Sequence, residues 1–171
     1  MSAHISRREF QRDLAQRLQS AARGETARSM LGFLSNQQFW LCELADAGAI
    51  VPLPPLLDVP LTRPWFAGIA NLRGTLYSVV DFSAYCGGEP TDRNSDARLL
   101  LIGAPLGSNS ALLVGRTLGL RSLANLEEDG GAAPPAQAWV GKSYRDEKGN
   151  AWCSLKIRQL LAHPDFLDIG L

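Results

Sequence analysis

The residues able to do covalent chemistry or to bind a metal are few and widely separated in this sequence. Its 171 residues include three cysteines, Cys42, Cys86 and Cys153, and two histidines, His4 and His163. A nucleophilic cysteine needs a base within hydrogen-bond reach, and neither histidine lies near a cysteine in the sequence. No cluster of acidic residues and histidines has metal-ligand spacing, and no glycine-rich phosphate motif follows a strand. We therefore expect no catalytic residue, no bound metal and no cofactor.

The composition is that of an ordinary globular protein without a net charge. Hydrophobic residues make up 46% and charged residues 20%, and 17 basic residues balance 17 acidic ones. This balance favours neither nucleic acid nor an anionic membrane as a partner. No apolar run approaches the roughly 20 residues of a membrane helix, and the odd number of widely spaced cysteines suggests no disulfide framework. We expect a soluble, cytoplasmic protein that does not insert into the membrane.

The first 28 residues predict a basic helical extension. Apolar residues recur every four positions from Phe10 to Leu18, with polar residues between them, which is typical of an amphipathic helix. Ser6 and Glu9 have the spacing of a capping box at its start. We expect this extension either to pack on the body of the protein or to recruit a partner of its own.

Beyond residue 28 the sequence changes to short apolar runs separated by turn residues, which is typical of an all-β protein. Four hairpins are expected, formed by residues 31–34 with 39–44, 69–72 with 76–82, 99–102 with 111–114, and 139–144 with 151–155. The proline-rich stretch 50–57 predicts an extended connector and not a central strand, because proline donates no ladder hydrogen bond. Residues 157–161 predict a short C-terminal helix.

A faint internal repeat groups these strands into two parts. Trp65 opens a WFAG run that Trp139 echoes as WVG, and each run leads into a hairpin with a glycine at its turn, Gly74 or Gly149. Many short strands together with this duplication favour two small related β-barrels. We expect residues 29–171 to form one domain of two β-subdomains.

The turn of the second hairpin is the best candidate for recognition. Gly74 can take the positive φ that a tight turn demands, and Asn71 tolerates a left-handed conformation better than most residues. Arg73 is thereby presented at the edge of a turn, where its five donors can bind a carboxylate. The alternative is that Arg73 is simply a solvated turn residue.

This hairpin resembles a known family. Residues 65–74 (WFAGIANLRG), followed by VVDF at 79–82, resemble the signature hairpin of CheW-like coupling proteins. Residues 98–102 and 112–120 are similar to the family's next two strands and the connector after them. The proline-rich connector and the C-terminal residues resemble the PilI type, which serves type IV pilus twitching systems. The resemblance implies two interlocked five-stranded SH3-like β-barrels, flanked here by the N-terminal helix and the short C-terminal helix.

The resemblance also implies a role without chemistry. Such a protein joins the regulatory domain of a CheA-type histidine kinase to the cytoplasmic tip of a methyl-accepting chemoreceptor, in the cytoplasm at membrane-associated receptor arrays. Ile69 and Leu72 would line the groove for the receptor, and the region 39–44 would contact the kinase. The residues implied in partner binding are Gly68, Ile69, Asn71, Leu72, Arg73, Gly74, Phe39, Leu41 and Glu43.

One departure from the family pattern concerns the partner of Arg73. The family usually has an acidic residue just before the first connector that can pair with this arginine, but the spacing puts Ala47 or Gly48 there. Arg73 is therefore expected to pair with Glu43 or Asp46, or to be free for a partner. Two other functions stay open: a flagellar chemotaxis adaptor of the same fold, and a small β-barrel enzyme or ligand carrier.

Overall fold

The structure is a computed structural model that describes residues 29–130 and 137–171. The expected N-terminal helix, with the rest of residues 1–28, lies outside the described residues. The described chain is mostly β, with three short α-helices: α2 (Phe82–Tyr85), α3 (Ile157–Ala162) and α4 (Pro164–Leu167). The C-terminal helix expected at 157–161 is therefore confirmed as α3, and a second short helix follows it.

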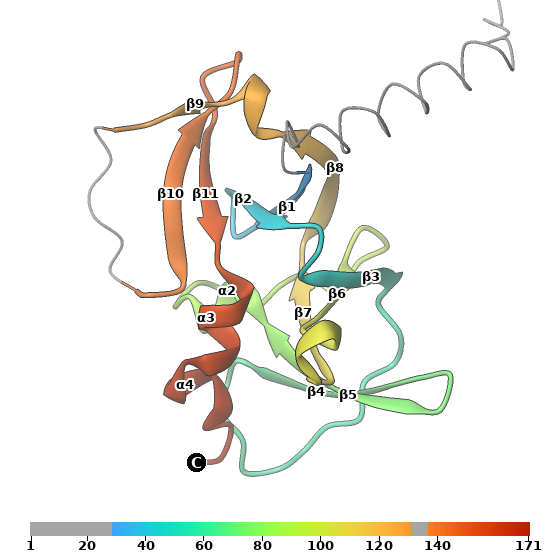
Figure 1. Ribbon diagram of the computed structural model, residues 1–171. Coiled ribbons are helices and arrows are strands. Elements are labelled where there is room, and N and C mark those ends of the chain that lie inside the picture. The colour runs from blue at the N-terminus through green and yellow to red at the C-terminus, as the bar shows by residue number, and fades with distance from the viewer. Residues whose placement is uncertain (1–28, 131–136) are drawn as a thin grey trace, which may run out of the picture.

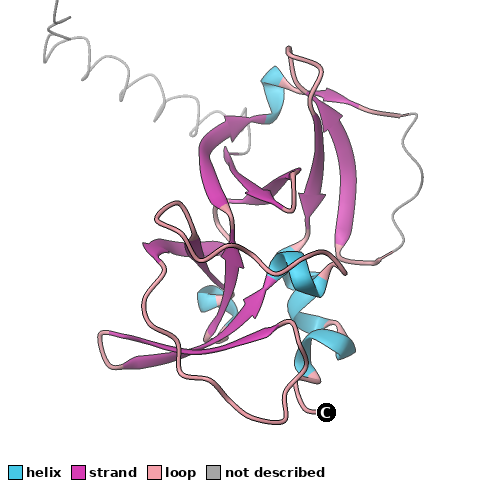
Figure 2. Cartoon of the chain, turned by 180° about the vertical axis from the view of Figure 1, so that it is seen from behind, coloured by secondary structure: helices cyan, strands magenta, loops and turns pink. Residues whose placement is uncertain are grey.

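The strands form two sheets that lie one above the other in Figures 1 and 2. The upper, six-stranded sheet has the order β8 (Arg116–Ser122), β1 (Ser29–Ser35), β2 (Gln38–Glu43), β11 (Ala151–Leu155), β10 (Val140–Arg145) and β9 (Glu127–Glu128). The lower, five-stranded sheet has the order β3 (Ala47–Pro52), β6 (Arg98–Ile102), β7 (Ser110–Val114), β5 (Thr75–Asp81) and β4 (Phe66–Leu72). The all-β class is confirmed.

The two sheets are interlocked because the chain leaves the upper sheet and later returns to it. After β2 it crosses to the lower sheet, builds all five strands there, and crosses back at Gly115 into β8. The amide N–H of Gly115 donates to the carbonyl of Leu34, which ties this crossing to β1. Residues 116–120, which none of the four expected hairpins included, are thus part of a strand. They pair with β1 at long range, which local patterns do not reveal.

The faint sequence repeat corresponds to a structural repeat. Each sheet begins with three antiparallel strands, and the third of them pairs in parallel with one strand of a hairpin. In the upper sheet β2 pairs in parallel with β11 of the β10–β11 hairpin, and in the lower sheet β7 pairs in parallel with β5 of the β4–β5 hairpin. The carbonyl of Trp65 accepts the N–H of Asp81 at 2.8 Å, and the carbonyl of Trp139 accepts the N–H of Lys156 at 2.8 Å. Each of these two N–H donors belongs to the N-cap residue of the helix that follows, α2 or α3.

The described residues form three buried apolar clusters, one large and two small. The side chains of β2 contribute to two of them. Trp40 and Cys42 pack in a large cluster to which both sheets contribute, whereas Phe39 and Leu41 pack in a small one with strands of the upper sheet. Another small cluster belongs to the lower sheet. Successive side chains of a strand point to opposite faces, so β2 is buried on both. Each subdomain thus has its own small core, and the large core joins the two.

The proline-rich stretch is partly a strand. Its first residues, up to Pro52, belong to β3, which pairs only with β6 and is therefore an edge strand, where proline is tolerated. Beyond Pro52 the chain runs as an extended connector, as expected. Leu57 in this connector forms an isolated antiparallel bridge with Ile69 of β4.

Candidate partner-binding site

The turn between β4 and β5 presents Arg73 as the sequence suggests. Leu72 pairs with Thr75, so the loop contains only Arg73 and Gly74, with φ values of 52° and 84°. Two central residues with positive φ match a type I′ turn, whose twist suits a hairpin. The side-chain oxygen of Asn71 accepts the amide N–H of Gly74 at 3.0 Å and so holds the turn. The hairpin extends away from the body of the molecule (Figures 1 and 2).

The guanidinium of Arg73 is exposed to solvent. Within the described residues, no hydrogen bond or ion pair engages its side chain. Asp46, one of the two partners considered from the sequence, forms an ion pair with Arg158 at 3.4 Å instead. Glu43, the other, lies at the end of β2 in the upper sheet. Arg73 is therefore available to a carboxylate of another molecule.

Gly68 allows close packing between the connector and β4, a structural role that the sequence did not reveal. Its φ is +129°, and a Cβ placed there would lie 2.5 Å from the carbonyl oxygen of Leu57. That carbonyl accepts the N–H of Ile69 at 2.9 Å, and the N–H of Leu57 donates to Ile69 at 2.8 Å. Only glycine lets the connector approach β4 this closely. Gly68 thus holds the connector against the edge of the lower sheet.

Ile69 and Leu72, predicted to line one groove, lie on opposite faces of β4. Ile69 packs against the large shared core, and Leu72 packs against the small core of the lower sheet. Both are only partly buried, but an odd separation of three along a strand points their side chains in opposite directions. The structure does not bring them together in one groove.

Leu57 and Leu76, which sequence reasoning missed, lie on the same face of the β4 edge as Ile69. Leu57 is opposite Ile69 in the bridge, and Leu76 is opposite Asn71 in the hairpin. Their exposed fractions are 68% and 58%, large for leucine. Leu76 could have been found, because a two-residue turn at Arg73 and Gly74 sets the register that places it opposite Asn71.

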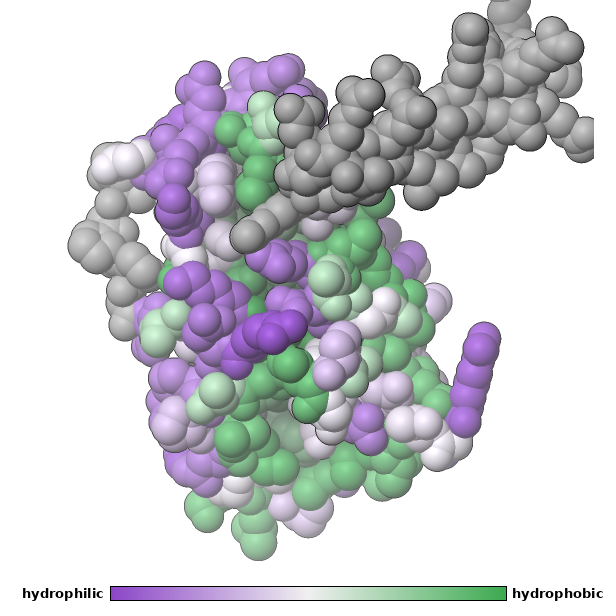
Figure 3. Space-filling model, viewed as in Figure 1, coloured by the Kyte–Doolittle hydropathy of each residue, from purple (hydrophilic) through white to green (hydrophobic). Residues whose placement is uncertain are grey.

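We call the group of Leu57, Ile69, Asn71, Arg73 and Leu76 the hairpin surface. It combines exposed apolar side chains with an exposed guanidinium on one edge of the lower sheet. Apolar surface gathers over the lower part of the molecule in Figure 3, whereas polar surface prevails over the upper part. Exposed apolar groups beside a charge are typical of protein interaction sites.

The three candidates on β2 differ in what they can offer a partner. Leu41 has 0% exposure and packs in the small core of the upper sheet, so its side chain has no surface for contact. Phe39 is partly exposed and stacks on Trp152, with ring centroids 4.9 Å apart. Glu43 is partly exposed, and the next residue, Leu44, is exposed. The accessible part of the predicted kinase region is thus Phe39 and the segment 43–44.

Asp81, the acidic residue of the VVDF run, is a structural residue. Its buried carboxylate accepts hydrogen bonds from the N–H of Thr91 at 2.8 Å, from the Thr91 hydroxyl at 2.7 Å, and from the N–H of Ala84 at 3.4 Å. It therefore caps α2 and fixes the loop that follows. Lys156 holds the equivalent position in the repeat, and its side chain makes no cap.

The described residues offer little reactive chemistry. Burial raises the pKa of the Cys42 thiol to about 12, with further contributions from Asp46 and Glu43, so this thiol stays protonated and unreactive. Among residues 29–130 and 137–171 no group of three or more histidine, cysteine or acidic side chains could hold a metal ion. No helix in this part of the chain is long and apolar enough to cross a membrane.

Comparison with known proteins decides the family. The model of the CheW-like domain matches residues 29–165, which covers both sheets, α3 and the first turn residues of α4. The chain belongs to the CheW-like domain family. CheW-like proteins are scaffolds of chemotaxis signalling that couple receptors to a CheA kinase, and they are not enzymes.

Two known CheW-like proteins show how far the similarity extends. Protein PilI of Pseudomonas aeruginosa strain PAO1 is 23% identical over 171 residues, which span 93% of each chain. The crystal structure of scaffolding protein TtCheW from Thermoanaerobacter tengcongensis superposes with a TM-score of 0.67 at 17% identity. That match covers 83% of this chain and 97% of TtCheW. The CheW-like fold expected from the hairpin motif is therefore confirmed.

Proposed function

We propose that this CheW-like protein is the coupling adaptor of a chemosensory system that controls type IV pilus twitching motility. It joins the cytoplasmic tip of a methyl-accepting chemoreceptor to the regulatory domain of a CheA-type histidine kinase, at receptor arrays on the cytoplasmic side of the membrane. The similarity to PilI, which extends over 93% of both chains, supports the pilus system. Deleting the gene should then abolish twitching; intact twitching with lost swimming chemotaxis would favour a flagellar adaptor instead.

The observation that carries the receptor contact is the exposed, unpaired guanidinium of Arg73 on a hairpin tip held by Asn71. Because the turn is fixed by a hydrogen bond, little conformational entropy is lost when a partner binds it. The exposed leucines of the hairpin surface, Leu57 and Leu76, supply apolar area beside the charge. We propose that this surface binds the receptor tip, with Arg73 pairing with a receptor carboxylate.

The kinase contact is assigned to the upper sheet, at Phe39, Glu43 and Leu44. The two proposed contacts lie on different sheets, so one adaptor can hold both partners at once. Holding them together converts a weak encounter into a high effective concentration of kinase at the receptor. A change of receptor state then alters kinase activity only through contacts that differ between the two states.

The test is a charge reversal at Arg73, measured as binding to a purified receptor tip and, separately, to the kinase regulatory domain. Arg73→Glu should weaken receptor binding about tenfold or more, because a carboxylate then faces a carboxylate. Kinase binding should stay within about twofold, because the contacts are separate. Circular dichroism of the variant should match that of the wild type.

The matched control is Arg93→Glu, which makes the same charge change at an exposed arginine in the loop after α2. It should leave both affinities unchanged. If Arg73→Glu and Arg93→Glu behave alike, the assignment of the receptor contact to Arg73 is wrong.

A further inference from the structure

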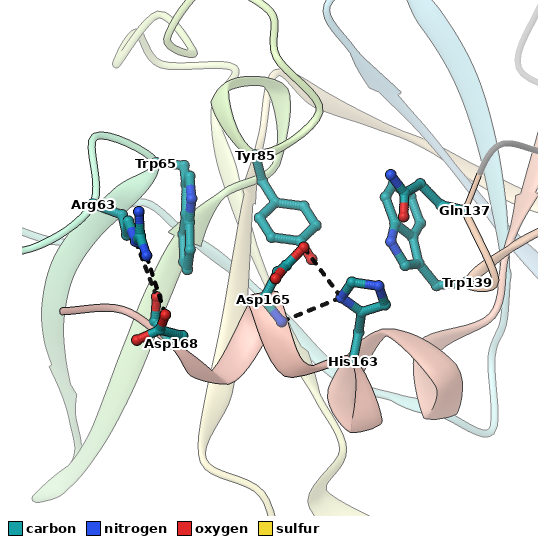
Figure 4. Close-up of a pocket in the computed structure, with 8 residues that line it drawn as sticks. All are labelled: Arg63, Trp65, Tyr85, Gln137, Trp139, His163, Asp165 and Asp168. Atoms are coloured by element: carbon teal, nitrogen blue, oxygen red, sulfur yellow. Dashed lines mark hydrogen bonds and ion pairs between the residues drawn. The ribbon is translucent and has the colours of Figure 1, made fainter. Parts of the chain in front are cut away.

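A cavity of about 340 Å³ lies where the two halves of the structural repeat meet the C-terminal helices. Trp65 reaches it from just before β4 and Trp139 from just before β10, so equivalent residues of the repeat line the same space. Tyr85, at the end of α2, lies between them in Figure 4. The remaining lining residues are polar: Arg63, Gln137, His163, Asp165 and Asp168.

The aromatic wall of this cavity is held rigidly. The ring of Tyr85 meets Trp65 edge to face at 5.1 Å and lies 5.7 Å from Trp139. On another side Tyr85 contacts Phe166 of α4, with ring centroids 5.6 Å apart. Trp139 is buried, whereas Trp65 and Tyr85 keep part of their surface open to the cavity. The π-faces of such rings attract a cation.

The carboxylates at the mouth outnumber the cations there. The side chains of Asp165 and Asp168 are 82% and 67% exposed. Arg63 pairs with Asp168 at 3.1 Å, which neutralises one of them. The Nδ1 of His163 accepts the backbone N–H of Asp165 at 3.3 Å and lies 3.9 Å from the Asp165 carboxylate. Within the described residues, no arginine or lysine forms an ion pair with Asp165.

The electrostatic effect of Asp165 reaches Tyr85 inside the cavity. Burial raises the pKa of its hydroxyl to about 12, and the negative charge of Asp165 is the next contribution, followed by Cys86. Figure 4 shows Asp165 between the Tyr85 ring and the His163 imidazole. Burial disfavours a charge of either sign, whereas the negative charge of Asp165 disfavours a phenolate and favours a positive group.

We propose that this cavity binds the guanidinium of an arginine side chain from a partner protein. The planar guanidinium stacks on the ring of Trp65 and meets Tyr85, whose ring stands at 89° to that of Trp65, edge to face, while its N–H groups donate to the Asp165 carboxylate. A lysine fits less well, because its ammonium has no flat face and cannot form the two parallel hydrogen bonds of a guanidinium–carboxylate pair. The site is separate from the hairpin surface, so it gives the adaptor an additional attachment point.

The test uses the full chain with 15N-labelled tryptophan, whose four indole N–H signals are assigned with single Trp→Phe variants. The probes are three blocked tripeptides, Ac-Gly-X-Gly-NH2, where X is arginine, citrulline or lysine. The arginine probe should shift the signals of Trp65 and Trp139 saturably and leave those of Trp40 and Trp152 in place. Citrulline, which keeps the shape without the charge, should bind about tenfold more weakly or worse.

Asp165→Asn should weaken binding of the arginine probe about tenfold, since it removes the negative charge of this carboxylate and keeps the shape of the side chain. Asp92→Asn, the same change at an exposed residue that lines a different cavity, should leave binding unchanged. No shift with the arginine probe, or equal shifts with citrulline, would overturn the proposal. A third experiment uses no probe and replaces Arg7, Arg8 and Arg12 of the N-terminal segment by Gln. A shift of the Trp65 and Trp139 signals in that variant would also overturn the proposal, because the cavity would then bind the chain's own N-terminal segment.

Discussion

Replacing Gly68 with alanine tests whether the edge of the lower sheet depends on the close approach of the connector. An added Cβ would lie 2.5 Å from the carbonyl oxygen of Leu57 and 3.2 Å from its carbonyl carbon. Both atoms belong to the backbone, so no side-chain rotation relieves the overlap. The connector must move away from β4, and the two hydrogen bonds between Leu57 and Ile69 are lost.

The expected cost follows from two contributions. Alanine at a φ of +129° is strained by about 1–3 kcal/mol. Each lost backbone hydrogen bond adds about 0.5–1.5 kcal/mol. We therefore expect Gly68→Ala to lower the free energy of unfolding by about 4 kcal/mol, and the melting temperature by about 10 °C. Urea unfolding followed by circular dichroism measures the first quantity, and a thermal scan measures the second.

Gly74→Ala is the matched control. Gly74 also has a positive φ, +84°, but an added Cβ would meet no atom within 4 Å. Only the backbone strain applies there, about 1–2 kcal/mol. If Gly68→Ala costs no more than Gly74→Ala, the close approach to Leu57 does not stabilise the fold and the reasoning fails.

Three further predictions concern the polar groups that fix turns and helix ends. Asp81→Ala should lower the free energy of unfolding by about 3 kcal/mol in urea, because the N–H and hydroxyl of Thr91 lose a charged acceptor. Lys156→Asp should raise it by about 1 kcal/mol, since the new carboxylate can cap α3 as Asp81 caps α2; no gain would contradict the equivalence of the two positions. Hydrogen bonds, above all the one from the Trp152 indole, lower the pKa of Asp146 from 3.8 to about 2. The ionised carboxylate therefore stabilises the folded state above about pH 4, and this stabilisation is lost as the pH falls through about 2. Asp146→Asn should therefore lose less stability over that range than the wild type in acid titrations followed by fluorescence.

Local sequence patterns were sufficient to predict the β4–β5 hairpin and its two-residue turn. Gly74 and Asn71 have the residue types that a type I′ turn and its side-chain cap require, and the structure has both. Arg73 could be placed at the tip for the same reason. The repeat of Trp65 and Trp139 indicated two related halves, and each tryptophan carbonyl accepts an equivalent hydrogen bond in its own half.

Contacts between distant segments could not be predicted in this way. β2 is buried on both faces, so Leu41 has no alternation with polar neighbours that would mark it as inward-facing. The partner of Asp46 is Arg158, 112 positions away. The task of Gly68 depends on Leu57, which the fold brings to β4 through an isolated bridge. Such pairs become visible only when both sheets are assembled.

The central claim is that this CheW-like protein bridges a receptor and a kinase, and co-sedimentation tests it most directly. Vesicles carrying a pilus chemoreceptor are mixed with the CheA-type kinase, with and without the chain, and the kinase in the pellet is measured. The account predicts that the kinase sediments with the vesicles only when the chain is present, and that Arg73→Glu lowers its amount about tenfold. Equal sedimentation of the kinase with and without the chain would contradict it.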